Sequence, residues 1–369
     1  MKKILITGGA GFIGSHLCDE LLRYGYEPIV FDNLDPQVHG LVEDIPEYLP
    51  KDVSFIYGDL RDESALNRAV RKADAVVHFA AKVGVGQSMY QIEQYTDVNN
   101  RGTAILLDIL SRNPTKKLLV ASSMSIYGEG YYQYNGRPTE VPLRPQSQLQ
   151  EGLWDVQYQG QPLSPLPTDE EKNPTLASVY ALSKYDQERI CLMVGEAYNF
   201  PVVALRFFNV YGERQSLSNP YTGVLAIFAA RLLCGKEPIV FEDGLQMRDF
   251  VNVRDVATAC RLALESEAAN HQAINIASGK SYSILEVARH LSRVISGEAS
   301  EPIITGKYRT GDIRNCFADI SKAQALLGYQ PAVDFEQGLT SLASWLETQQ
   351  ITDQGERAAR ELAERDLTV

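Results

Sequence analysis

The sequence has few cysteines, no long apolar run and no excess of basic residues, and each absence excludes a class of protein. The five cysteines, at positions 18, 191, 234, 260 and 316, include no Cys-x-x-Cys pair. This argues against a zinc site and a disulfide framework, and it favours a reducing cytoplasm. No stretch approaches the roughly 18 consecutive apolar residues of a membrane-spanning helix. We therefore expect no metal and no membrane partner.

The balance of charge is acidic, with a formal net charge of −12. Nucleic acids and anionic lipids bind where a protein offers positive potential, so this balance disfavours both as partners. A small phosphorylated ligand is still compatible with it, because a few arginines or a helix N-terminus can bind phosphate locally.

A chain of 369 residues is longer than most single cores support, so two parts are expected. Short apolar runs first alternate with helical patterns, which predicts an α/β fold with a doubly wound (Rossmann) parallel sheet. The strand candidates are Lys3–Thr7, Pro28–Phe31, Val53–Tyr57, Ala75–Phe79, Leu118–Ser122 and Val202–Phe207. We expect the sheet over residues 1–200, a smaller mixed α/β substrate-binding lobe mainly over 201–349 with some segments returning to the sheet, and a charged C-terminal tail over 350–369.

Periodicity disappears between Gly128 and Pro174, where tyrosine, glutamine, proline and glycine dominate. A loop of this length inside a compact domain is usually either functional or disordered. Its tyrosines and Trp154 favour an ordered segment that covers a ligand, and its low aliphatic content leaves disorder as the alternative. We treat residues 129–174 as an insertion into the first domain.

A glycine-rich turn follows the first predicted strand. Gly8, Gly11 and Gly14 are spaced three apart, and Phe12 and Ile13 begin the helical pattern that follows. Glycine is needed where a turn takes unusual backbone angles and where amides approach a pyrophosphate. A glycine motif alone is weak, but the order strand, turn, helix predicts a dinucleotide site.

The ends of the next predicted strands add candidates to that site. Asp32, followed by Asn33, lies about 20 residues beyond the glycines, where a carboxylate can accept hydrogen bonds from the adenosine ribose and repel a 2′-phosphate. It therefore favours NAD over NADP, with a loop cap as the alternative role. The third and fourth strands end at Asp59-Leu60 and Phe79-Ala80-Ala81, at the edge of the sheet where ligands bind.

Tyr180 and Lys184 are four residues apart on a predicted helix from Ser178 to Tyr198, so they share one face. A phenol titrates near pH 10, but a nearby ammonium and a nicotinamide ring favour its ionised form, which makes Tyr180 a candidate general base and acid. Ser123, at the end of the fifth strand, can hydrogen-bond the same substrate oxygen. Such a tyrosine–lysine spacing also arises by chance, so its weight depends on the glycine turn and the serine.

Together these features resemble the extended short-chain dehydrogenase/reductase family, in its NAD-dependent nucleotide-sugar epimerase and dehydratase branch. The resemblance covers about residues 1 to 345. It is carried by Thr7-Gly8-Gly9-Ala10-Gly11-Phe12-Ile13-Gly14, Asp97-Val98-Asn99, Ser122-Ser123 with Tyr127-Gly128, Tyr180 with Lys184, Arg206-Phe207-Phe208-Asn209-Val210-Tyr211-Gly212, and Met247-Arg248-Asp249-Phe250.

The resemblance implies further site residues. Lys184 is expected to hold the nicotinamide ribose, and Asn99 to support the cofactor site, although helix capping would also explain an asparagine there. Arg248 and the segment Arg309-Thr310-Gly311-Asp312 are expected to bind the substrate diphosphate, because arginine matches phosphate oxygens in bidentate geometry. Surface salt bridges are the alternative for either arginine. Asn209 is expected to contact a phosphate or the sugar.

The resemblance also narrows the reaction. The dehydratases of this branch carry an acidic pair just after the residue equivalent to Ser123, and here those positions are Met124 and Ser125. We therefore expect epimerisation of a nucleoside-diphosphate sugar, at C4, through a 4-keto intermediate. The long insertion and Phe241-Glu242-Asp243-Gly244 most resemble the group similar to dTDP-L-rhamnose 4-epimerases, some of which have cysteines where this insertion has none.

Other activities stay open from the sequence alone. Net reduction, dehydrogenation or decarboxylation of a nucleotide sugar would use the same residues, and a catalytically silent NAD-binding regulator would keep only the cofactor site. The family commonly pairs through four helices. A homodimer through helices around Gln91–Leu110 and Ser178–Tyr198 is therefore expected.

Overall fold

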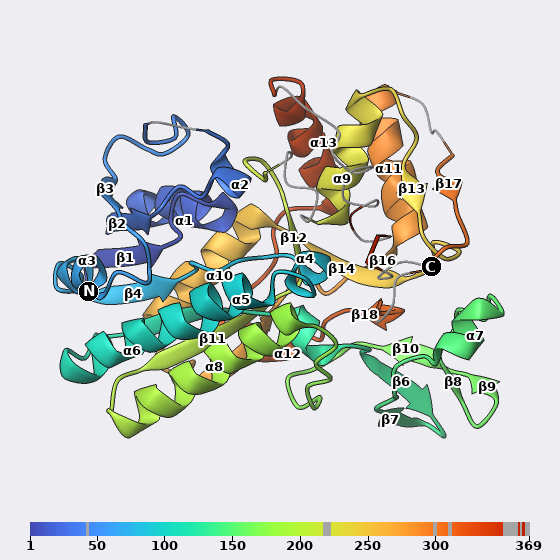
Figure 1. Cartoon of the computed structure of the whole chain (residues 1–369), viewed down its shortest axis with the longest axis horizontal. Helices are drawn as coiled ribbons and strands as arrows, with labels where there is room; N and C mark the ends of the chain where they lie inside the picture. Colours follow the sequence, from blue (N-terminus) through green and yellow to red (C-terminus); the bar gives the residue numbers. More distant parts are fainter. Residues whose placement is uncertain are drawn as a thin grey trace.

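Seven parallel strands form the central sheet of this computed structural model, and they confirm the predicted α/β class (Figure 1). β1 pairs with both β2 and β4, which is where the strand order reverses. Ligands of open α/β sheets bind in the crevice outside the strand ends at such a point. In spatial order the strands are β15 (Gln272–Ile276), β11 (Val202–Phe207), β5 (Leu118–Ser123), β4 (Ala75–His78), β1 (Lys3–Thr7), β2 (Glu27–Asp32) and β3 (Ser54–Tyr57).

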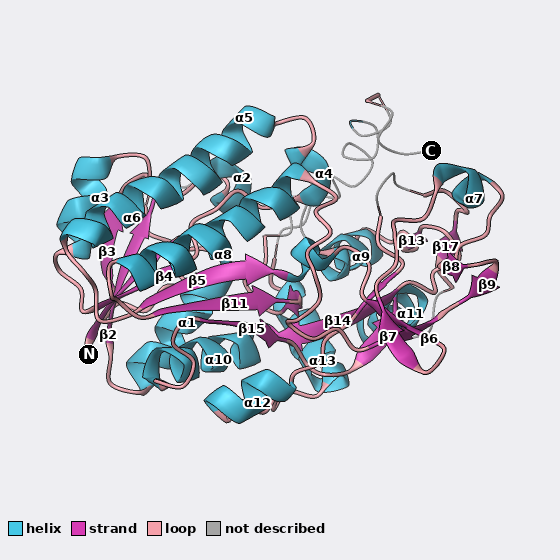
Figure 2. Cartoon of the chain, turned by 90° about the horizontal axis from the view of Figure 1, so that it is seen from below, coloured by secondary structure: helices cyan, strands magenta, loops and turns pink. Residues whose placement is uncertain are grey.

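Helices cover both faces of this sheet, and Figure 2 shows the two layers. On one face α1 (Phe12–Arg23), α10 (Val253–Glu265) and α12 (Ser321–Leu327) share an apolar core with the strands. On the other face α3 (Glu63–Val70), α6 (Gly102–Arg112) and α8 (Val179–Ala197) do the same. Burial from both sides explains why β5 begins with the apolar run Leu118–Ala121 and β11 with the apolar run Val202–Leu205, with no alternating polar residues in either run.

A smaller lobe has a core of its own, formed by α9 (Val224–Leu233), α11 (Ile284–Ser296) and α13 (Phe335–Leu346). These helices pack beside the strands β12 (Asn209–Tyr211), β14 (Met247–Asn252), β16 (Ser281–Ser283) and β18 (Asn315–Cys316), and β13 (Ile239–Val240) pairs with β17 (Ile303–Ile304). The lobe is not continuous in sequence, because β15, α10 and α12 return to the large sheet.

The insertion is ordered and forms secondary structure of its own. A three-stranded sheet forms its centre, in the order β10 (Ser164–Leu166), β6 (Tyr131–Tyr134), β7 (Arg137–Thr139). The remainder holds α7 (Gln146–Gln150) and a hairpin of β8 (Gln157–Tyr158) and β9 (Gln161–Pro162). Although the insertion lacks a periodic pattern of aliphatic residues, it has a small core of its own, formed by Tyr132, Val141 and Val156.

Short helical segments complete the chain: α2 (Pro36–His39), α4 (Val85–Ser88), α5 (Ile92–Tyr95), the π-helix η1 (Thr96–Arg101) and the 3₁₀ helix η2 (Met124–Tyr127). The structure describes residues 1–41, 44–216, 223–297, 301–308, 312–349, 361, 364 and 365. The predicted site residue Arg309 and most of the predicted tail lie outside these ranges. Within them, no helix has the length and apolar character needed to span a bilayer.

Candidate functional site

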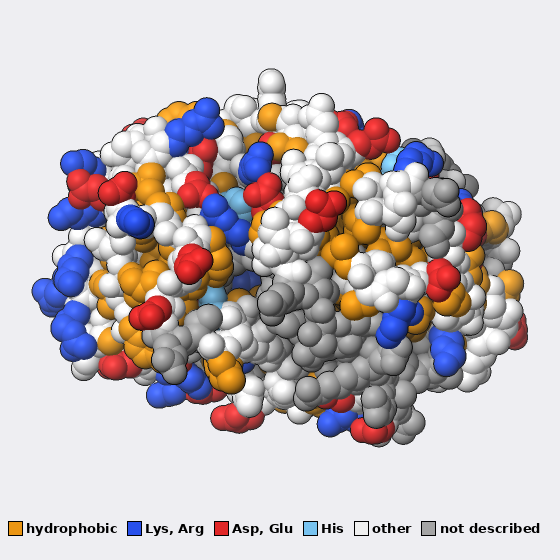
Figure 3. Space-filling view, turned by 90° about the horizontal axis from the view of Figure 1, so that it is seen from above, with side chains coloured by type: hydrophobic (Ala, Val, Ile, Leu, Met, Phe, Trp, Pro, Cys, Tyr) orange, Lys and Arg blue, Asp and Glu red, His pale blue; other side chains and the backbone are white. Residues whose placement is uncertain are grey.

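A cavity of about 1460 Å³ lies between the end of the large sheet and the lobe. It exceeds the roughly 300–1,000 Å³ of a typical single-ligand pocket, which leaves room for two ligands together. In Figure 3, Lys, Arg and His side chains are seen in a hollow near the middle of this face. Its wall brings together the predicted residues Gly8, Gly11, Phe12, Ile13, Gly14, Asp32, Asn33, Asp59, Leu60, Phe79, Ala80, Ala81, Ser123, Tyr180, Lys184, Asn209, Arg248 and Asp312.

The glycine turn is shaped by close backbone contacts. Gly8 has a φ of +68°, and a Cβ there would lie 2.7 Å from the backbone nitrogen of Ala80 at the end of β4. At Gly14 a Cβ would lie 2.6 Å from the Cα of Gly9. Gly11 caps α1 without a side-chain hydrogen bond, so the amides of the first turn stay available to an anion. The turn therefore fits the pyrophosphate of a dinucleotide.

Asp32 stands at the end of β2 with its carboxylate buried at the cavity wall. One oxygen accepts a hydrogen bond from the amide of Ala10 at 3.0 Å, and the other accepts one from Leu34 at 2.9 Å. Burial raises the pKa of this carboxyl group, and the two backbone amides oppose the rise. Both oxygens retain a further lone pair, as the predicted contact to a ribose requires.

Two residues of the cavity wall were not predicted from the sequence, His39 beside Asp32 and Arg61 beside Asp59. The Nε2 atom of His39 lies 3.8 Å from an Asp32 oxygen, and His39 lines the cavity. Arg61 donates hydrogen bonds to Asp59, whose pKa is held well below its usual range mainly by that guanidinium. The sequence shows only that His39 and Arg61 follow Asp32 and Asp59 in their loops. It does not show in which direction their side chains point.

Ser123 and Tyr180 form the reactive end of the cavity. The Ser123 hydroxyl lies close enough to Tyr180 to influence its titration, and the Ser123 oxygen accepts hydrogen bonds from the amide and hydroxyl of Ser125, at 3.2 and 2.9 Å. Burial raises the pKa of Tyr180, and the neighbouring Ser123 hydroxyl opposes this rise. A substrate hydroxyl that reaches Tyr180 therefore also meets Ser123.

Lys184 belongs to a buried network of polar side chains. Its Nζ donates to the Gln187 side chain at 2.8 Å, and Gln187 donates to the Thr103 hydroxyl at 2.8 Å. His78, deeply buried beneath, contacts the same hydroxyl at 2.9 Å. Burial lowers the pKa of Lys184 to about 8, against the opposing effects of Cys191 and Glu188. The spacing predicted which face Lys184 occupies, but not this buried network.

The lowered pKa of Lys184 predicts that cofactor retention depends on pH. The ammonium form predominates below about pH 8 and is lost as the pH rises through that value. We expect NAD content after gel filtration to fall between pH 7 and pH 9, because the amine donates fewer hydrogen bonds to the cofactor than the ammonium. A Lys184→Met variant should retain less NAD and lose this pH dependence. An unchanged slope in the variant would contradict the assignment.

Asn99 supports the cavity from behind and is not among the described residues that line it. Its amide oxygen accepts from the backbone of Lys82 at 2.7 Å, and its amide nitrogen donates to the Lys82 carbonyl and to the Ser183 hydroxyl, at 3.1 and 2.9 Å. These bonds use both hydrogens of the amide nitrogen. Asn99 therefore bridges the loop after β4 and the helix α8 behind the cavity wall.

The other end of the cavity carries Arg248, Asp312 and Asn209. The Arg248 guanidinium donates to the carbonyls of Met247 and Arg314, at 2.9 and 3.0 Å, and to that of Ile313. An Asp312 oxygen lies 3.7 Å from Arg248, so this acid neutralises the arginine as well as lining the cavity. The Asn209 amide oxygen is buried without a hydrogen bond among the described residues, as expected of a group reserved for a ligand.

Comparison with known proteins identifies relatives that align with almost the whole chain. A family model for the NAD dependent epimerase/dehydratase family matches residues 4–150 and 156–277. The dTDP-L-rhamnose 4-epimerase of Burkholderia thailandensis is 35% identical over 352 residues, which are 94% of this chain and 95% of that protein.

Solved structures agree with this similarity. The UDP-glucose 4-epimerase of Thermus thermophilus, in complex with NAD, is 31% identical with a TM-score of 0.74 and covers 94% of this chain and 99% of that one. The UDP-glucose 4-epimerase of Thermotoga maritima, with UDP-glucose, is 30% identical with a TM-score of 0.75 and covers 94% and 98%.

Proposed function

Because the chain belongs to the NAD dependent epimerase/dehydratase family, we propose that it is an NAD-dependent epimerase that inverts C4 of a nucleoside-diphosphate sugar. One observation carries this proposal. The neighbouring side chains of Ser123 and Tyr180 lie on the wall of the cavity that also holds the glycine turn and Arg248. Groups suited to a dinucleotide, to a sugar hydroxyl and to a diphosphate thus share one chamber.

NAD, when bound, would accept the hydride of C4 and would give it back to C4 afterwards. The protein's own residues handle the proton and the orientation. Tyr180 takes the proton of the C4 hydroxyl as the carbonyl forms and gives it back as the hydroxyl is restored. Ser123 holds the same oxygen in place, and Ser125 keeps the Ser123 oxygen fixed by donating to it. The sugar must present its other face between the two steps.

Water loss requires a second acid–base pair beside C5 and C6, and the chain offers none at the expected place. Met124 is a buried apolar side chain, and the Ser125 hydroxyl is engaged with Ser123. Neither side chain can act as a carboxylate. The proposed reaction therefore stops at the 4-keto stage and returns to the alcohol.

The base and the sugar are decided by experiment. The purified protein would be incubated with UDP-, dTDP- and GDP-hexoses, among them UDP-glucose and dTDP-L-rhamnose, and inversion at C4 would be followed by proton NMR. We expect one nucleotide series to equilibrate between C4 epimers without added NAD and without NADH accumulation. Stoichiometric NADH, or release of carbon dioxide from a uronic acid, would instead indicate a dehydrogenase or decarboxylase.

We propose that the protein forms a homodimer through the helical segment around residues 91–110 and through α8. Ile92 and, on α8, Leu182 and Met193 are 54%, 53% and 52% exposed, although all three are apolar. Pairing would remove these side chains from water. Light scattering at micromolar concentration should give twice the 41.0 kDa chain mass, and Leu182→Glu should shift it toward the monomer. A monomeric wild-type protein would refute the pairing.

We also propose a cytoplasmic location. All five cysteines are free, and four of them are buried in apolar surroundings, which suits a protein that folds under reducing conditions.

A further inference from the structure

The insertion supplies part of the wall of the proposed nucleotide-sugar site. Leu143, Arg144, Gln146 and Leu149 line the cavity together with Phe241, Gln246, Tyr308 and Asp312 of the lobe. Trp154 lies against Tyr308, with ring centroids 6.2 Å apart. Two polar atoms in this region, the Gln246 amide oxygen and the Tyr308 hydroxyl, are buried without a hydrogen bond among the described residues. Such groups usually await a ligand or water.

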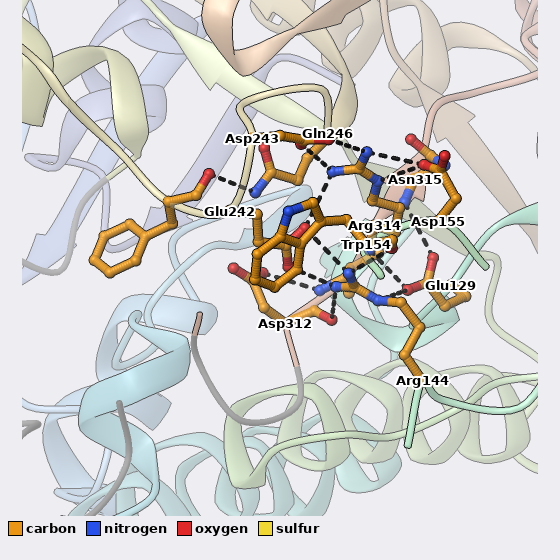
Figure 4. Close-up of polar contacts among 12 residues, drawn as sticks. Glu129, Arg144, Trp154, Asp155, Glu242, Asp243, Gln246, Asp312, Arg314 and Asn315 are labelled. Carbon is orange, nitrogen blue, oxygen red and sulfur yellow. Dashed lines mark hydrogen bonds and ion pairs between the residues drawn. The ribbon is translucent and has the colours of Figure 1, made fainter. Parts of the chain in front are cut away.

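Buried ion pairs fasten the insertion to the lobe (Figure 4). The side chains of Arg144, Glu129 and Glu242 are 1–2% exposed, and Arg144 makes two parallel hydrogen bonds to Glu242, at 2.8 and 3.0 Å. Arg314 reaches Glu242, Asp243 and Asp155 from the other side. Charges so deeply buried are stable only when each is paired and hydrogen-bonded. The cluster therefore fixes the position of the insertion.

Arg144 has no spare Nη hydrogen for a ligand. Beyond its two bonds to Glu242, the guanidinium donates to the carbonyl of Trp154 at 2.8 Å and to that of Asp312 at 3.1 Å. These four bonds use all four Nη hydrogens. Its remaining Nε lies 3.6 Å from Glu129. Arg144 thus acts on its neighbours and not on a bound molecule.

One neighbour of Arg144, the segment 312–314, also contacts Arg248. The segment 312–314 is held on one side by Arg144, through the Asp312 carbonyl, and by Glu129, which accepts from the Arg314 amide at 2.7 Å. On the other side, the carbonyls of Ile313 and Arg314 accept from the Arg248 guanidinium. The same short segment therefore connects the insertion to the arginine expected to bind diphosphate.

We infer that Arg144 is a positioning residue of the nucleotide-sugar site: it fixes segment 312–314, which orients Arg248, and so makes the insertion part of the diphosphate-binding machinery. This inference rests on the proposed function. The insertion then sets the affinity for the nucleoside-diphosphate half of the substrate. It leaves the chemistry at Tyr180 unchanged.

Binding of free nucleoside diphosphates tests the inference. UDP, dTDP and GDP would be titrated calorimetrically into NAD-loaded wild type, Arg144→Met and Arg144→Lys. Because Arg144→Met leaves the buried Glu242 carboxylate with Arg314 as its one cationic partner among the described residues, the double variant Arg144→Met/Glu242→Gln removes the whole Arg144–Glu242 pair. Arg248→Met is the reference for a lost phosphate contact. Arg137→Met, an exposed arginine on the same insertion, is the matched control.

We expect Arg144→Met and the double variant to raise the Kd of the nucleoside diphosphate that wild type binds by about tenfold or more, with a smaller rise for Arg144→Lys. KM should rise in parallel, while kcat and NAD content should stay within about twofold of wild type. This is the result expected if Arg248 is misoriented, because substrate binding is then weakened and the chemical step is not. Arg137→Met should match wild type throughout.

Three outcomes would overturn the inference and leave the proposed function standing. The first is an unchanged Kd in Arg144→Met and in the double variant while Arg248→Met weakens binding. The second is a joint loss of NAD, kcat and nucleotide affinity, which indicates general damage. The third is an unchanged Kd in Arg248→Met, because the positioned arginine would then have no role. Failure of wild type to bind any of the diphosphates would instead remove the proposed function, and the inference with it.

Discussion

Replacing Tyr180 with phenylalanine is expected to lower kcat by about 10²- to 10⁴-fold, which is the usual contribution of a positioned general acid–base group. The change removes one hydroxyl and keeps the ring in its edge-on contact with Tyr95, whose ring centroid is 6.4 Å away. Nucleotide-sugar KM and bound NAD should therefore change little. Initial rates of epimer formation, measured by NMR, give kcat directly.

The matched control is Tyr198→Phe at the end of the same helix, where the side chain is 54% exposed. It should retain full activity. A Tyr180→Phe variant with wild-type kcat would show that another group moves the proton, and the role of the Ser123–Tyr180 pair would have to be abandoned.

Replacing Gly8 with alanine is expected to abolish retention of NAD through purification. The backbone at Gly8 has a φ of +68°, and the new Cβ would meet the Ala80 nitrogen at 2.7 Å. The three nearest atoms, in Ala80 and Phe79, all belong to the backbone, so the turn must shift away from the position in which its amides face the pyrophosphate. A loss of about 1.4 kcal/mol of binding corresponds to a tenfold weaker cofactor affinity. Absorbance ratios of the purified protein and fluorescence titration with NADH would measure the effect.

Gly25→Ala separates backbone strain from the effect on the site. Gly25 has a similar φ of +80°, but a Cβ there meets nothing within 4 Å. Both variants should lose about 1–2 kcal/mol of folding stability from the left-handed backbone, and only Gly8→Ala should lose NAD. Equal NAD retention in the two variants would contradict the assigned role of the turn.

The sheet and the cofactor half of the site follow from local sequence patterns. β1 covers the predicted Lys3–Thr7 and β11 the predicted Val202–Phe207, because strands buried on both faces are short apolar runs that the sequence displays directly. The glycine turn and Asp32 could be assigned because both follow such runs at fixed spacing. Parallel strands bring their ends to one edge, so residues far apart in sequence were placed together without knowledge of side-chain contacts.

The substrate half depends on contacts that no spacing encodes. Arg144 and Glu242 are 98 residues apart, and Glu129 bonds the backbone of Arg314 across 185 residues. The resemblance indicated Arg248, but the carbonyls that orient it belong to another segment. The partner of Lys184 was missed for a different reason. Gln187 is one helical turn away on α8, but local sequence does not say which of its polar neighbours a buried ammonium will choose.

The most direct test of the central claim uses a nucleotide sugar that carries deuterium at C4, chosen from the series that the protein epimerises. The account predicts that the C4 epimer forms with the deuterium still at C4, in ordinary water and with no NADH in solution. Deuterium lost to solvent, or appearing in free reduced cofactor in proportion to product, would contradict it.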